Sequence, residues 1–193
     1  MTRKIVYTEP ASYFPKDVLE KAFGKAAADA AMQCESAGAV PEEKKLFEYR
    51  LSGARDGEYS RVIVLDSPGN TVLFGKIEDY PLCDHILYVD DNELHSLKLS
   101  DAAMSAVKAA LQDSRLYTLG ELECIPIEDG WENKVSIRNG SVVKVIEGYN
   151  LSYAIRHPKA FPNAAVLARF IRKMSTILGP EGVDKACLYL GHR

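Results

Sequence analysis

Residues 128–178 constrain the fold more than any other part of this chain, because they combine the signals for a β-hairpin with those for an amphipathic helix. Residues 134–146 carry apolar side chains on both sides of Asn139-Gly140, a pair that favours a tight hairpin turn. Over residues 163–178 the apolar residues recur at three- and four-residue steps, which is the period of one helical face. The chain is therefore predicted to pack an antiparallel strand pair against a helix.

The register of this hairpin decides which side chains face the core. A two-residue turn at the Asn-Gly pair would split the valines between the two faces. A three-residue loop, residues 139–141, instead pairs Ile137 with Val143 and Val135 with Val145, so that the apolar side chains share one face. We therefore expect the three-residue loop.

Further elements follow from the same periodicities. Alternating or β-branched runs predict strands at residues 47–52, 62–65, 71–77, 85–89, 94–99 and 117–127, and a short docked strand at residues 187–190. Helices are predicted after Pro15 up to about Cys34, and after Ser100, a residue type favoured at helix N-caps.

These elements predict an α+β fold: one or two antiparallel β-sheets with amphipathic helices packed on one face. Residues 46–112 and 116–178 each run from strands into a helix, so two similar β-meander-plus-helix halves are an open alternative. We expect one α+β domain over residues 1–193, with a subdivision into 1–113 and 114–193 left open. Alternating βα units and a glycine-rich phosphate loop are lacking, which disfavours a doubly wound nucleotide-binding fold.

Composition excludes some classes of function. Hydrophobic residues make up 47 % of the chain, enough for a core that needs neither disulfides nor a metal, and no cofactor is expected. The net charge of −3 argues against a general binder of nucleic-acid phosphates. Charge is uneven, however: residues 151–193 carry seven Lys/Arg and two Asp/Glu, giving +5, and the remaining residues carry −8.

Cysteine spacing and hydropathy predict the compartment. The four cysteines are far apart and form no Cys-x-x-Cys pair. No stretch approaches the roughly 20 apolar residues that cross a bilayer, and the first residues lack the features of a signal peptide. We expect a cytoplasmic protein with reduced thiols and no membrane contact.

Two groups of residues are candidates for chemistry. Cys83, His85, Asp91 and His95 include the usual metal-binding side chains, and would also suit a small metal-dependent or thiol hydrolase. The simpler interpretation is that the acidic residues here support a tight turn, because Asp and Asn bond to their own backbone. We prefer this simpler interpretation and expect no metal site.

A second group would serve binding. It contains the single tryptophan and the basic C-terminal residues: Trp131, Arg156, His157, Arg169, Arg172 and Lys173. A tryptophan beside acids is a possible recognition platform, but the alternation after it favours a hairpin anchor packed against the last helix. The basic residues could contact nucleic acid, yet a solvated helix places its charges in the same way, so nucleic-acid binding is disfavoured.

The sequence as a whole favours a non-enzymatic protein that binds a protein partner or itself. The chain contains ten tyrosines, a residue type that suits interfaces. This hypothesis predicts an exposed apolar patch that bears tyrosine.

Overall fold

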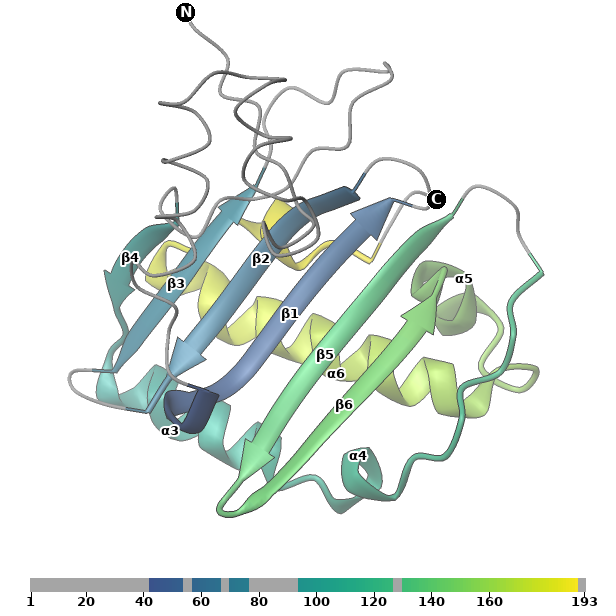
Figure 1. Ribbon diagram of the computed structural model, residues 1–193, viewed down its shortest axis with the longest axis horizontal. Coiled ribbons are helices and arrows are strands. Elements are labelled where there is room, and N and C mark those ends of the chain that lie inside the picture. Colours follow the sequence, from purple (N-terminus) through teal and green to yellow (C-terminus); the bar gives the residue numbers. More distant parts are fainter. Residues whose placement is uncertain (1–41, 54–56, 67–69, 77–93, 127–129, 191–193) are drawn as a thin grey trace, which may run out of the picture.

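The strands of this protein form one six-stranded antiparallel sheet, in the order β4-β3-β2-β1-β5-β6, with the helices behind it (Figure 1). The computed structural model describes residues 42–53, 57–66, 70–76, 94–126 and 130–190. The strands are β1 (Lys45–Gly53), β2 (Gly57–Leu65), β3 (Thr71–Lys76), β4 (His95–Lys98), β5 (Trp131–Asn139) and β6 (Val142–Tyr149). The helices are α3 (Asp101–Leu111), α4 (Ser114–Thr118), α5 (Leu151–Arg156) and α6 (Pro162–Leu178), with short 3-10 turns η2 (Glu42–Lys44), η4 (Gly179–Glu181) and η5 (Lys185–Leu188). The predicted α+β class is confirmed.

The core lies between the sheet and the helices. Phe47, Tyr49 and Leu51 alternate along β1 and are fully buried, as their two-residue period predicts. The Phe47 ring packs edge-to-face on Phe170 of α6, with ring centroids 5.8 Å apart. Because β1 pairs with both β2 and β5, strands from residues 1–113 and from residues 114–193 lie in one sheet.

The two predicted helices that fall in the described ranges are confirmed. Ser100 Oγ accepts a hydrogen bond from the Ala103 backbone N–H and caps α3. The predicted apolar face of α3 is buried in full: Ala103, Met104, Val107, Ala110 and Leu111. Helix α6 buries Leu167, Phe170, Met174 and Leu178 and exposes its basic residues. The predicted helix at residues 15–34 and the strand at 85–89 lie outside the described residues.

The strand prediction at residues 117–127 is wrong. The Asp113 side chain accepts from the Arg115 N–H and starts α4, after which residues 119–126 continue without regular structure. Lys144 of β6 donates from Nζ to the carbonyls of Tyr117 (3.3 Å) and Leu119. In a strand, backbone N–H groups of a neighbouring strand would donate to these carbonyls; here a side chain does. This segment does not pair as a strand and instead packs on the core through individual side chains, such as the buried Leu119.

The predicted C-terminal strand is also wrong, although the segment is docked. Residues 185–188 form the turn η5, which begins where Asp184 Oδ1 accepts from the Ala186 N–H at 2.9 Å. Cys187, Leu188 and Leu190 are buried, so the apolar residues do return to the core.

The hairpin register differs from the predicted one. Asn139 pairs with Val142, which leaves Gly140 and Ser141 as a two-residue loop, and Val135 lies opposite Ile146. Gly140 has a positive φ of 60° and Ser141 does not, a pattern typical of a type II′ turn, whose first position favours glycine. The three-residue loop is therefore replaced by a register in which Val143 and Val145 of β6 do not face the helices.

No helix within the described ranges is long and apolar enough to cross a membrane.

Candidate functional site

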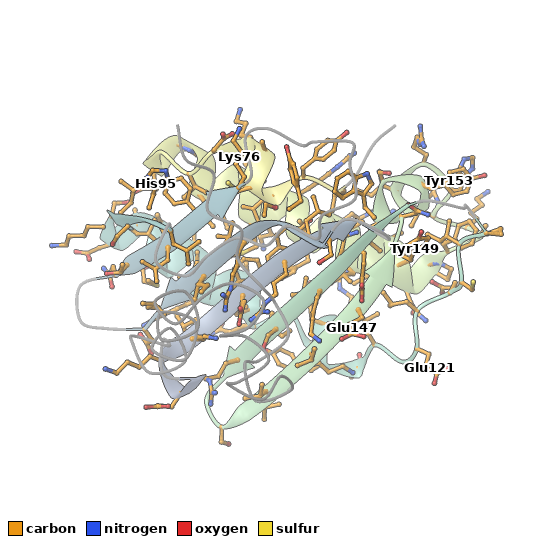
Figure 2. The ribbon with its side chains drawn as sticks, turned by 45° about the horizontal axis from the view of Figure 1, so that its top comes forward. Lys76, His95, Glu121, Glu147, Tyr149 and Tyr153 are labelled. Atoms are coloured by element: carbon orange, nitrogen blue, oxygen red, sulfur yellow. The ribbon has the colours of Figure 1, made fainter. Side chains whose placement is uncertain are left out.

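The open edge of the sheet at β6 carries most of the exposed apolar side chains. Val142, Val143 and Val145 are 54 %, 49 % and 51 % exposed, and in the described part of the chain Tyr189 is the one other large hydrophobic residue that is exposed. β6 is the last strand of the sheet, with Glu147 and Tyr149 along it, while His95 and Lys76 mark the opposite side (Figure 2).

The hairpin register places Val143 and Val145 on the outer face, which is the face of the sheet opposite the helices, while Val142 lies at the start of β6 on the helix side. Ile146 and Gly148 face the helices, so their neighbours Val145 and Glu147 must face outward. Gly148 has no room for a side chain, because a Cβ there would lie 2.8 Å from Leu122 and 2.7 Å from Leu151. This close packing identifies the face of β6 that contains Ile146 and Gly148 as the buried one.

The edge of β6 lacks the usual protection of an outward lysine. Its single lysine, Lys144, points toward the helix side and bonds with the carbonyls of Tyr117 and Leu119. Among the backbone hydrogen bonds of the described residues, β6 is joined to β5 and to no other strand. An apolar strand with an open edge can pair with a strand of another chain.

A second feature is a groove of about 730 Å³ where α5, the end of α6 and the C-terminal segment meet. Its polar lining comes from Arg172, Lys185 and the hydroxyl-bearing residues Ser152, Ser175 and Thr176. Its apolar lining includes Leu188 and Leu190. The groove therefore combines positive charge, hydroxyl groups and an apolar wall.

A third feature is a charged cluster on the outer face of the sheet. Glu48 accepts hydrogen bonds from Lys45 Nζ (3.0 Å), Arg61 Nε (2.8 Å) and Arg50 Nε (2.9 Å). The side chains of Glu48, Lys45 and Arg61 are 8–9 % exposed. Burial raises the pKa of Glu48, but the charges of Arg50, Arg61 and Lys45 outweigh burial and lower this pKa to about 2. The carboxylate stays ionised at neutral pH and holds three cations on neighbouring strands.

The predicted binding residues do not form one site. Trp131 is half-buried and packs edge-to-face on Tyr59 of β2, with ring centroids 5.4 Å apart. Arg156 and His157 are exposed and contact the Tyr153 ring, at 5.7 Å for the guanidinium and 4.2 Å between ring centroids.

The three basic residues of α6 are also exposed, as predicted: Arg169, Arg172 and Lys173. Of these, Arg172 lines the groove. Sequence periodicity assigns all three to the polar helix face and gives no signal that separates Arg172 from the others.

The predicted metal or thiol site is only partly described. Cys83, His85 and Asp91 lie outside the described residues. His95 is exposed on β4, with its ring 5.5 Å from the Phe74 ring. Within the ranges that the structure covers, no three His, Cys, Asp or Glu side chains lie close enough to share a metal ion.

The two cysteines in the described ranges differ in environment. Cys124 is exposed and Cys187 is buried. Burial and the nearby Asp184 carboxylate raise the pKa of the Cys187 thiol to about 12, against a smaller opposing effect of Lys76. Since the thiolate is the reactive form, Cys187 is a packing residue.

The chain was compared with protein-family models and with curated proteins. Neither comparison gave a match. The edge of β6, the groove and the charged cluster are therefore the features of the molecule that bear on its function.

Sequence reasoning predicted none of these three features. Val143 and Val145 were assigned to the core face, although Gly140-Ser141 offered a signal for the observed loop, since glycine favours the first position of a type II′ turn. The groove combines α5, α6 and the C-terminal segment, and no local pattern in the sequence indicates that combination.

Proposed function

We propose that this chain is a protein-binding module that associates with a second copy of itself through the edge strand β6. The observation that supports the proposal is the pair of exposed valines Val143 and Val145 on the outer face of the last strand of the sheet, next to the exposed Val142 at its start. Exposed apolar side chains on an open strand edge are typical of association surfaces.

A second copy fits this edge because β6 can be its own partner. In a two-fold symmetric antiparallel pair centred on Val145, each Val145 lies opposite its copy and each Val143 lies diagonal to it. Both open edges then gain backbone hydrogen bonds, and Val143 and Val145 of the two copies form one apolar cluster on the outer face. The two sheets become one continuous sheet, as in other β-strand additions.

The patch differs in composition from the expected one. Its exposed residues are valines, while the exposed Tyr189 lies on the rim of the groove. The tyrosine count of the chain therefore lends this proposal no support.

Light scattering coupled to size-exclusion chromatography tests the proposal. Wild-type protein is expected to be a dimer, and Val145→Lys is expected to raise the dimer dissociation constant at least about tenfold, because it places two like charges opposite each other at the symmetry axis. Ser96→Lys is the matched control, since Ser96 is exposed on β4, the strand at the other edge of the sheet. This control should remain a dimer.

Disulfide trapping tests the register. Val145→Cys at the symmetry axis brings two cysteines to the Cα separation of about 5.5 Å found in antiparallel pairs, which a disulfide accepts. Mild oxidation should give a covalent dimer of this variant and none of Ser96→Cys. A wild-type protein that stays monomeric at high concentration would overturn the proposal.

A further inference from the structure

The groove between α5, α6 and the C-terminal segment has the properties of a preformed ligand site. Its volume of about 730 Å³ is in the range of small-molecule sites, which is about 300–1,000 Å³. Its C-terminal wall is anchored to the sheet: Tyr49 Oη donates to the Tyr189 carbonyl, and Ser60 Oγ donates to the Cys187 carbonyl at 3.1 Å. The wall is held in place by buried side chains, so binding does not have to order it.

The groove is positively charged. Arg172 and Lys185 line it, and among the described residues that line it none carries a carboxylate. Neither cation forms an ion pair with any residue that the structure describes. Their charges are available to a ligand.

The acidic residues nearest in sequence bind elsewhere. Glu181 accepts from the backbone N–H and from the hydroxyl of Ser100, both at 2.8 Å. Asp184 forms an ion pair with Lys76 at 2.8 Å and accepts from the Ala186 N–H. These hydrogen bonds lower the pKa of both carboxyl groups, so both stay ionised with their present partners.

A purely structural role for the two cations is to neutralise the C-terminal end of α6, whose carbonyls carry partial negative charge. Of the last four carbonyls of α6, those of Ser175 and Leu178 accept from the N–H groups of Gly179 and Val183. Arg172 lies more than one turn before this end, and the last turn of α6 contains no basic residue, so Arg172 is not placed to neutralise the helix end.

The lining indicates the class of ligand. Arg172 and Lys185 suit a dianion, and the Ser175 hydroxyl also lines the groove, while the Thr176 hydroxyl donates to the Arg172 carbonyl at 3.0 Å. Tyr189, which is 38 % exposed, supplies an aromatic side chain to the groove, whereas Leu188 and Leu190 behind it are buried. We propose that the groove binds a small phosphomonoester, with its phosphate at Arg172 and Lys185 and an apolar or aromatic portion against Tyr189. This inference is independent of self-association through β6.

Calorimetric titration with phenyl phosphate at low salt and pH 7.5, where the phosphate is largely dianionic, tests this proposal. Phenyl phosphate is expected to bind, and Arg172→Gln and Lys185→Gln are each expected to weaken binding about tenfold through loss of one charge-assisted contact. The matched controls are Arg169→Gln and Lys173→Gln, because both residues are exposed on α6 and do not line the groove. Both controls should bind as wild type does.

Two other probes separate the parts of the ligand. Phenol lacks the charge and is expected not to bind, and inorganic phosphate lacks the ring and is expected to bind more weakly than phenyl phosphate. All four substituted side chains are exposed or at the groove surface, so thermal unfolding should show intact folding in each variant.

Three results would overturn the proposal: no binding of phenyl phosphate up to about 10 mM, equal losses in the groove variants and the controls, or equal affinity for phenol. Equal affinity for inorganic phosphate would overturn the role of the Tyr189 side chain.

Discussion

At the scale of single residues, Gly130 and Asn150 join the start of β5 to the end of β6. Asn150 has a left-handed φ of 51°, and its Oδ1 accepts from the Trp131 N–H at 3.0 Å. Its own N–H donates to the Trp131 carbonyl at 2.9 Å. Gly130 lies directly against the Asn150 side chain and donates from its N–H to Tyr149 Oη at 2.6 Å.

We predict that Gly130→Ala lowers the free energy of unfolding by about 2 kcal/mol or more. A Cβ at this position would lie 1.9 Å from Asn150 Oδ1, so Asn150 must move and lose its hydrogen bond to Trp131. Urea denaturation measures the change. Gly120→Ala is the control, because a Cβ there meets nothing within 4 Å, and a comparable loss in Gly120→Ala would contradict this explanation.

At the scale of elements, α6 is held at its N-terminus by a residue far away in sequence. Phe161 at the N-cap position provides no side-chain cap. Glu123 instead accepts from the backbone N–H groups of Asn163 (3.0 Å) and Ala164 (2.9 Å). Burial raises the pKa of Glu123, but these hydrogen bonds outweigh it and lower the pKa overall. A carboxylate at this end also interacts favourably with the helix dipole.

We predict that Glu123→Ala costs about 1 kcal/mol of stability, the typical effect of removing an N-cap. The same substitution at Glu121 is the control, since Glu121 is exposed on the same irregular segment (Figure 2). Thermal unfolding of both variants measures the difference. Equal unfolding temperatures for the two variants would show that Glu123 does not cap α6.

The β5–β6 hairpin shows why register is harder to predict than element type. Both candidate registers considered from the sequence placed Asn139 in the loop, whereas Asn139 ends β5 and pairs with Val142. A one-residue difference in register moves a side chain to the other face of a sheet. Val143 and Val145 therefore lie on the outer face, although apolar grouping had assigned them to the core.

At the scale of the whole molecule, the Glu48 cluster links the chain across neighbouring strands of the sheet. Glu48 and Arg50 lie on β1, Arg61 lies opposite on β2, and all contribute to one buried or half-buried network. Because the carboxylate is ionised and its partners are cations, removal of its charge would take away a buried ion-pair contact from both Lys45 and Arg61.

We predict that this cluster makes stability depend on acid pH. The pKa of Glu48 is about 2 in the folded state, below the ordinary value of 4.5 that applies when unfolded. The contribution of Glu48 is therefore fully present above about pH 5 and is lost as the pH falls toward 2, amounting to about 3 kcal/mol. Urea denaturation between pH 7 and pH 2 measures this loss.

Glu48→Gln provides the contrast. It should be less stable than wild type at pH 7 and show a flatter decline toward pH 2. Glu147→Gln is the control, because the Glu147–Lys134 ion pair is about half exposed and surface pairs contribute little. An unchanged acid decline in Glu48→Gln would show that other carboxyl groups carry the pH dependence.

The sequence by itself determined the α+β class, the faces of α3 and α6 and the alternation of β1, because each of these is a local period of 3.6 or 2 residues. The tertiary structure decided the register of β6, the irregular path of residues 119–126 and the groove that joins Arg172 to Lys185. Each of these depends on contacts between segments far apart in the chain, such as Lys144 with the Tyr117 carbonyl and Tyr49 with the Tyr189 carbonyl. The edge of β6 and the groove, to which we assign function, are both produced by such long-range contacts, so local sequence patterns do not predict them.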